Sequence, residues 1–144
     1  VPPELVFDAG FGELFVIRVA GSVLGPSILG TLQYAGLHLR TPLFVVMGHE
    51  GCGAVKAAIA SRFHGSRQAG RIEILLEQIL PALDGLDPQA SPDELLCAAV
   101  EANVRHTVRA LLATPEAQTR LGEGVMRLVG AVYELDTGRV RFLD

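Results

Sequence analysis

The chain has 144 residues, of which 49% are hydrophobic and 19% are charged, which suits one domain with a substantial core. Its net charge of −4 and its aromatic content of 6% argue against a surface that tracks phosphates or stacks bases. No apolar run reaches transmembrane length, and the first residues do not resemble a signal peptide. We therefore expect a single domain over residues 1–144, in the cytoplasm, with no nucleic-acid or membrane partner.

The first third of the chain predicts alternating strands and helices. Residues 13–20 (ELFVIRVA) are apolar and β-branched and follow turn residues, which is typical of a strand. Residues 27–39 have apolar side chains at helical spacing. The run TPLFVVMG at 41–48 predicts a strand covered on both faces, hence a parallel one, and residues 52–63 predict the next helix. This order predicts a right-handed βαβ unit.

The rest of the chain predicts helices followed by a hairpin. We expect a helix over 71–83 that Pro81 kinks or ends, and a long helix to about residue 113. Ser91 and Glu94 form a capping-box pattern that starts this long helix, and a short helix follows residue 114. Alternating runs on both sides of Asp136–Thr137–Gly138 predict a β-hairpin. The expected fold is α/β, with a mainly parallel central sheet flanked by helices and a C-terminal β-hairpin.

One turn concentrates residues that can bind a metal. In VVMGHEGCGAV, His49 and Cys52 lie three residues apart, directly after the second predicted strand and before a helix. Ligands of open α/β sheets bind at such strand ends. Imidazole and thiolate are ligands that Zn²⁺ prefers, and the positive end of the helix dipole favours a thiolate at Cys52. Gly51 and Gly53 allow the backbone to wrap around such a site.

Spacing alone leaves another interpretation open. A His-x-x-Cys pair is a weak motif, and a small buried cysteine beside a helix-capping histidine has the same pattern. A reactive thiol is a third interpretation, with His49 as the nearby base. The second cysteine, Cys97, lies within an amphipathic helix, where a buried structural role is the common case, and nothing in the sequence supports a Cys52–Cys97 disulfide.

Three longer segments narrow these alternatives. Residues 2–58, PPELVFDAGFGELFVIRVAGSVLGPSILGTLQYAGLHLRTPLFVVMGHEGCGAVKAA, closely resemble the β-class carbonic anhydrases. AAVEANVRHTV resembles the long helix of that family, and MRLVGAVYELDTGRVRFL resembles its closing strands. The chain departs from the family at Val19 and Ser22, where many relatives carry asparagine.

The resemblance implies a zinc site held by two cysteines and one histidine. It makes His49 and Cys52 the second and third ligands, with Arg18 as a substrate-binding or site-supporting residue, although a strand-end arginine paired to a local carboxylate fits equally well. The first cysteine ligand of the family belongs to a Cys-x-Asp-x-Arg motif at the end of a preceding strand. We expect that motif, with its catalytic Asp–Arg pair, upstream of Val1, so that the domain over residues 1–144 is N-terminally incomplete. Cys97 and Asp8 are poor replacements for these residues.

The activity implied by the resemblance is reversible hydration of CO₂ to bicarbonate by zinc-bound hydroxide, in a homodimer or larger homo-oligomer. CO₂ is small and apolar, so we expect a narrow pocket with aliphatic or aromatic walls. With two of three zinc ligands, the 144-residue polypeptide itself is expected to be impaired. The alternatives are a catalytically inactive paralogue that serves as a structural or binding scaffold, and a hydrolase of a related small molecule such as CS₂.

Overall fold

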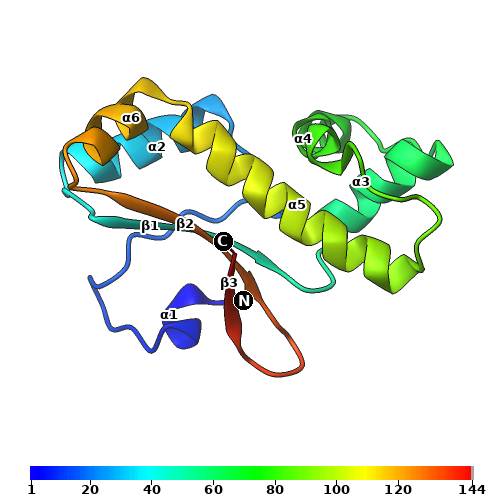
Figure 1. Cartoon of the computed structure of the whole chain (residues 1–144), viewed down its shortest axis with the longest axis horizontal. Coiled ribbons are helices and arrows are strands. Elements are labelled where there is room, and N and C mark those ends of the chain that lie inside the picture. The colour runs from blue at the N-terminus through cyan, green and yellow to red at the C-terminus, as the bar shows by residue number, and fades with distance from the viewer. Residues whose placement is uncertain (144) are drawn as a thin grey trace.

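The computed structural model describes residues 1–143 and shows a three-stranded sheet with most of its helices on one side (Figure 1). Strand β1 (Leu43–His49) pairs in parallel with β2 (Arg127–Tyr133), from Leu43 opposite Arg127 to His49 opposite Tyr133. Strand β3 (Val140–Leu143) pairs antiparallel with β2 and completes the predicted hairpin. The α/β class, the parallel strand within residues 41–48 and the C-terminal hairpin are therefore confirmed. The sheet is small and mixed, with the order β1-β2-β3, and is not mainly parallel.

The helices from residue 26 onward lie close to where the sequence predicts them, whereas the sequence does not predict the two short helical elements before them. The predicted bend at Pro81 is confirmed, because α4 (Arg71–Ile79) is followed directly by a short 3-10 helix, η2 (Leu80–Leu83), that contains Pro81. Within the described residues, no helix is both long and apolar enough to cross a lipid bilayer. The helical elements are α1 (Pro3–Val6), η1 (Ala20–Ser22), α2 (Pro26–Leu37), α3 (Gly53–His64), α4 (Arg71–Ile79), η2 (Leu80–Leu83), α5 (Pro92–Leu112) and α6 (Pro115–Gly122).

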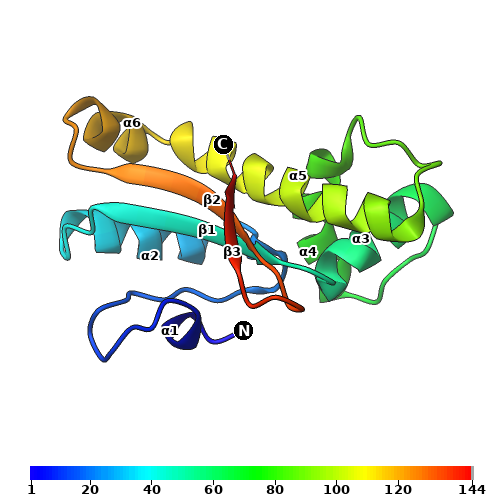
Figure 2. The same cartoon turned by 60° about the horizontal axis from the view of Figure 1, so that its bottom comes forward.

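The strand predicted over residues 13–20 is wrong. These residues belong to an N-terminal arm that leaves α1 and runs back beside β1 (Figure 2). The arm is extended at Val19 (φ −147°, ψ 146°), but residues 13–19 join no strand of the sheet. The β-branched pattern therefore specifies an extended backbone, whereas a strand also needs a neighbour for its N–H and C=O groups. The predicted βαβ unit does not form, and the parallel pair is β1 and β2 instead.

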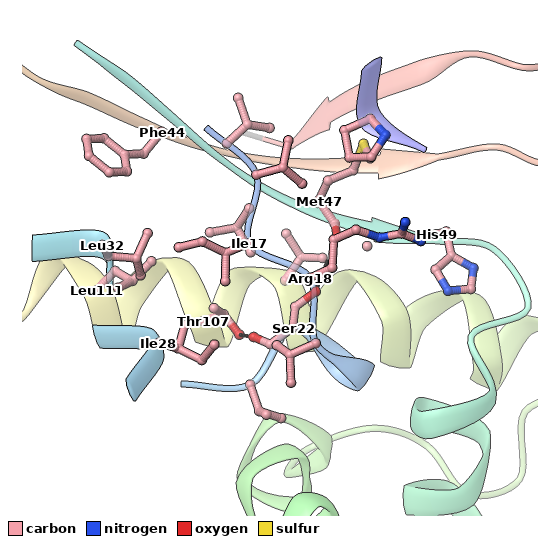
Figure 3. Close-up of a pocket in the computed structure, with 18 of the residues that line it drawn as sticks. Ile17, Arg18, Ser22, Ile28, Leu32, Phe44, Met47, His49, Thr107 and Leu111 are labelled. Atoms are coloured by element: carbon pink, nitrogen blue, oxygen red, sulfur yellow. Dashed lines mark hydrogen bonds between the residues drawn. The ribbon is translucent and has the colours of Figure 1, made fainter. Parts of the chain in front are cut away.

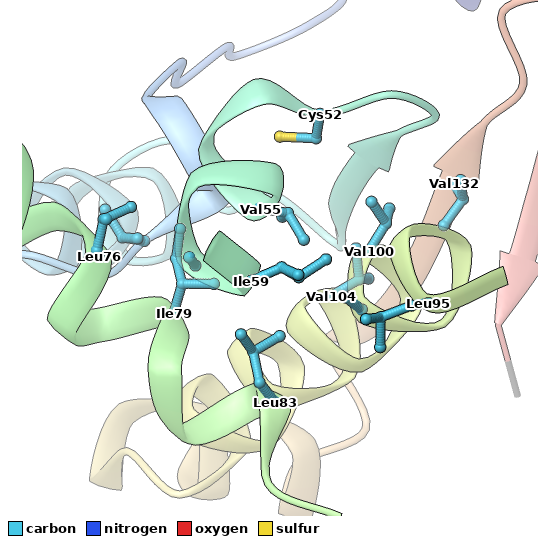
Figure 4. Close-up of a cluster of buried hydrophobic side chains, with 13 residues drawn as sticks. Cys52, Val55, Ile59, Leu76, Ile79, Leu83, Leu95, Val100, Val104 and Val132 are labelled. Carbon is cyan, nitrogen blue, oxygen red and sulfur yellow. The ribbon is translucent and has the colours of Figure 1, made fainter. Parts of the chain in front are cut away.

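Helix α5 is the long element that packs across both parallel strands (Figure 1). Two glycines permit the close approach. A Cβ at Gly48 of β1 would lie 2.7 Å from Val104 Cγ2, and one at Gly130 of β2 would lie 2.9 Å from Val104 Cγ1. Side chains of α3, α4, η2 and α5 fill the core beyond this contact, with Leu76, Ile79 and Leu83 almost fully buried (Figure 4). The end of β1 that carries His49 is thereby anchored to a packed core.

Helix α5 begins with the predicted capping box. The Ser91 hydroxyl accepts a hydrogen bond from the Glu94 N–H, and the Glu94 carboxylate accepts one from the Ser91 N–H. Hydrogen bonds from the Ser91 side chain and backbone lower the pKa of Glu94. A carboxyl group with a lowered folded pKa stabilises the fold above its unfolded pKa, and this contribution is lost as the pH falls through the folded pKa.

We expect Ser91→Ala to destabilise the domain by about 1 kcal/mol, because the Glu94 N–H at the start of α5 loses its acceptor. Urea unfolding near neutral pH measures this difference. Ser91→Thr is the matched control, since its hydroxyl can accept from the same N–H and donate to the Glu94 carboxylate, and it is expected to stay close to the parent. Equal stability of the alanine variant and the parent would contradict a stabilising role for this cap.

Candidate metal centre

The turn after β1 presents His49 and Cys52 at the carboxyl end of the parallel pair. Gly51 has φ +65°, a left-handed conformation that favours glycine, and it turns the chain from the strand toward α3. Cys52 is the N-cap residue of α3, and its carbonyl accepts the first helical hydrogen bond from Lys56 N–H at 2.9 Å. The backbone therefore places Cys52 at the N-terminus of a 12-residue helix that has no side-chain cap.

The imidazole of His49 is held in one orientation by the next residue. Its Nδ1 lies 2.8 Å from the backbone oxygen of Glu50. A carbonyl oxygen only accepts hydrogen bonds, so Nδ1 carries the proton and donates it. The other nitrogen, Nε2, then keeps its lone pair, which is the state in which histidine binds a metal. The histidine does not cap α3, because that helix has no side-chain cap at its N-terminus.

Cys52 is a buried thiol that lines the same cavity as His49. Its exposed fraction is 8%, and both Cys52 and Cys97 are free thiols. Figure 4 shows Cys52 at the edge of the core cluster, above Val55. Cys52 is therefore a small buried cysteine, as one interpretation of the sequence predicted, and it also lines the cavity.

A cavity of about 1190 Å³ lies between the N-terminal arm and β1 (Figure 3). Its walls are mainly aliphatic and aromatic, as predicted, but it is larger than the roughly 300–1,000 Å³ of a typical small-molecule pocket and is not narrow. Arg18 extends from the arm toward the end of the cavity at His49. The structure thus brings three of the predicted residues, Arg18, His49 and Cys52, to one cavity.

The other predicted residues lie around this cavity or away from it. Gly51 forms the turn, and Gly53 is the first residue of α3, where an added Cβ would meet open space. Cys97 is exposed on α5, so the expectation of a buried cysteine there is wrong, and neither it nor Asp8 lines the cavity. Across residues 1–143, no three His, Cys, Asp or Glu side chains lie together as a metal-binding group. His49 and Cys52 fit zinc by their chemistry, but they supply two of the four positions of a tetrahedral site.

Sequence reasoning missed the polar residues that hold the arm in place behind the site. The buried Asn103 side chain donates to the Gly21 carbonyl at 2.7 Å, and Thr107 donates to the Ser22 carbonyl at 3.1 Å. Ser22 in turn donates through its hydroxyl to the Met47 carbonyl of β1 at 3.2 Å. The sequence offered one signal for these contacts, because polar residues at core-facing positions of a helix need hydrogen-bond partners.

Ser22 has a left-handed backbone conformation, with φ +52°. Asparagine is enriched in this conformation among residues other than glycine. This chain therefore has serine at a position where the left-handed backbone favours the asparagine of many relatives.

These features define an α/β protein in which a histidine and a cysteine line one cavity at the end of a parallel strand. A model of the carbonic anhydrase family matches residues 1–140. The chain is 37% identical over 147 aligned residues to carbonic anhydrase 2 of Mycobacterium tuberculosis, and 35% identical over 146 to the carbonic anhydrase of Mycolicibacterium smegmatis. These alignments cover 100% and 97% of this chain, and 69% and 68% of the relatives. The chain belongs to the carbonic anhydrase family.

The solved structures place the chain in the β class of that family. A Coccomyxa β-carbonic anhydrase in complex with acetazolamide superposes with a TM-score of 0.89 at 28% identity, covering 99% of this chain and 66% of that one. A tetrameric β-carbonic anhydrase from Sordaria macrospora gives the same TM-score at 21% identity, which shows likeness of fold. The chain thus spans about two thirds of the length of the relatives that it matches.

Proposed function

We propose that this domain belongs to a zinc-dependent carbonic anhydrase that hydrates CO₂ to bicarbonate, in which His49 and Cys52 are two of the zinc ligands. The observation that supports this most strongly is their convergence on one cavity, with Nε2 of His49 free and Cys52 at a helix N-terminus. Family membership supplies the reaction. Oxygen of water bonds to the carbon of CO₂, and the proton that is lost passes to solvent.

The residues around the cavity have different tasks in this reaction. His49 would bind zinc through Nε2 while the Glu50 carbonyl holds its Nδ1 proton, and Cys52 would bind through its sulfur at the N-terminus of α3. Bound zinc supplies the Lewis acidity that ionises water near neutral pH. The aliphatic walls of the cavity accept apolar CO₂, and the positive charge of Arg18 favours the bicarbonate anion near the His49 end.

We propose further that a strand between the arm and β1 supplies the missing ligands. β1 is an edge strand that pairs with β2 on one side, and the extended arm lies across the cavity from its other edge. Exposed apolar side chains at Leu14 and Phe15 of the arm and at Leu43 of β1 suit an apolar strand between them. A strand parallel to β1 would end beside His49, which is where the family resemblance implies a Cys-x-Asp-x-Arg motif.

The test adds such a strand in trans. A synthetic peptide with an apolar strand followed by Cys-x-Asp-x-Arg is mixed with the chain and one equivalent of zinc, and CO₂ hydration is followed by stopped flow. We expect hydration above the rate of the chain with zinc alone. The control peptide carries serine in place of the cysteine and is expected to restore little activity. Binding of both peptides without any gain in hydration would contradict this proposal.

The setting of the enzyme is also part of the proposal. The arm exposes a group of large apolar side chains, which monomeric proteins rarely leave in contact with water, and this supports a homodimer or larger homo-oligomer. Apart from Leu14 and Phe15, which the proposed strand would cover, these side chains are Phe7, Phe11 and Val19, together with Leu5 of α1. The two free cysteines support a reducing, cytoplasmic compartment.

A further inference from the structure

Glu50, between the two candidate zinc ligands in sequence, joins the metal-binding turn to the C-terminal hairpin. Its backbone N–H donates to the carbonyl of Tyr133 at 3.0 Å, one residue beyond the His49–Tyr133 pair that ends the parallel ladder. Its carboxylate oxygen Oε2 accepts a hydrogen bond from the Leu135 N–H at 2.8 Å. Its own carbonyl accepts the Nδ1 proton of His49 at 2.8 Å. One residue therefore contacts the hairpin twice and the imidazole once.

The peptide group that orients His49 has little other support. The Glu50 carbonyl belongs to the peptide between Glu50 and Gly51, and Gly51 has φ +65°. Glycine has the widest choice of backbone conformations, so the peptide plane on its N-terminal side rotates at low cost unless something holds it. Glu50 lies on the other side of this peptide, and its two hydrogen bonds to the hairpin hold it in place.

From this geometry we infer that Glu50 is a positioning residue for the metal centre: its carboxylate, anchored on the Leu135 N–H, keeps the Glu50 carbonyl on Nδ1 of His49 and so aims Nε2 at the metal. The inference rests on the proposed function for its metal, but the orientation of the imidazole is a property of the chain alone. It also assigns a role to the β2–β3 connection, which otherwise lies outside the metal site.

The test compares three variants for zinc affinity, measured with zinc alone in competition with a chromophoric chelator. Glu50→Ala removes the acceptor for Leu135 and is expected to weaken zinc binding about 10- to 100-fold, the range typical for residues that orient a ligand. Glu50→Gln keeps an oxygen that accepts the same N–H and is expected to bind zinc nearly as the parent does. Glu134→Ala is the control in the same hairpin, because its carboxylate contacts Thr137 and Arg141 instead.

A second readout does not depend on zinc. In the metal-free chain above the pKa range of histidine, the ¹⁵N shifts of the His49 ring are expected to report a proton on Nδ1 in the parent and in Glu50→Gln. In Glu50→Ala we expect a mixture of the two tautomers and faster exchange of the Leu135 amide. If the parent bound no zinc while the tautomer changed as described, the assignment of His49 and Cys52 as a zinc-binding pair in this chain would fail, and the orientation of the imidazole by Glu50 would stand.

The opposite pattern would overturn the inference. An unchanged tautomer in Glu50→Ala, with parental zinc affinity, would show that His49 is oriented without Glu50. A drop in melting temperature with unchanged zinc affinity would reduce Glu50 to a structural link between the turn and the hairpin. An equal loss of zinc affinity in Glu134→Ala would show that the affinity depends on the integrity of the whole hairpin and not on Glu50 in particular.

Discussion

Replacement of Cys52 by alanine is expected to abolish stoichiometric zinc binding. The substitution removes one of the two candidate zinc ligands that the described part of the chain brings to the cavity, and His49 alone would be a weak ligand. Loss of a residue that only hydrogen-bonds to a metal ligand typically weakens metal binding about 10- to 100-fold. We expect a larger loss of zinc affinity in Cys52→Ala, because the ligand itself is removed. Zinc bound per chain after equilibrium dialysis, measured by elemental analysis, gives the comparison.

The second cysteine provides the matched control for this experiment. Cys97 is an exposed thiol on α5, outside the cavity, so Cys97→Ala is expected to bind zinc as the parent does. The double variant should then behave like Cys52→Ala. Equal zinc losses in the two single variants would indicate non-specific binding by thiols, and parental binding by Cys52→Ala would remove Cys52 from the ligand set.

Gly48→Ala is expected to destabilise the domain by about 1–3 kcal/mol. The new Cβ would meet Val104 Cγ2 at 2.7 Å and Val100 Cγ1 at 3.3 Å. Both contacts are with stiff, β-branched side chains of α5, so the helix has to move away from the sheet. Because Gly48 directly precedes His49, the shift is also expected to weaken zinc binding. Urea unfolding measures the stability, and dialysis with zinc measures the second effect.

Gly30→Ala is the matched control, with the opposite expected sign. Gly30 is an exposed residue within α2, and an added Cβ there meets nothing within 4 Å. Alanine in a helix interior is favoured over glycine by roughly 0.5–1 kcal/mol, so this variant should be more stable than the parent. A Gly48→Ala domain as stable as the parent would show that α5 and β1 are less tightly packed than the structure indicates.

The elements that the sequence predicts well are those whose signals are local. Ser91 and Glu94 mark the start of α5 through a capping box, and Pro81 marks the end of α4, because each acts on its own backbone neighbours. The helices and the hairpin accordingly begin and end near their predicted residues. The pairing of His49 with Cys52 at one strand end also follows from local spacing.

The elements that it predicts poorly depend on distant partners. Residues 13–20 have the composition of a strand, but whether they form one depends on a neighbour that the described chain does not place there. The contacts of Glu50 with Leu135 and of Asn103 with Gly21 join residues more than 80 positions apart. A core-facing polar position on α5 singles out Asn103, but no sequence pattern identifies the distant partner in either contact. The size of the cavity between the arm and β1 follows from the same missing pairing.

X-ray absorption at the zinc K-edge of the zinc-loaded chain tests the assignment of the zinc ligands most directly, because it reports which atoms surround the metal. We expect one sulfur at about 2.3 Å and at least one imidazole nitrogen at about 2.0–2.1 Å, with the sulfur lost in Cys52→Ala and kept in Cys97→Ala. A shell of nitrogen and oxygen atoms alone, or a sulfur that remains in Cys52→Ala, would contradict the assignment of His49 and Cys52 as zinc ligands.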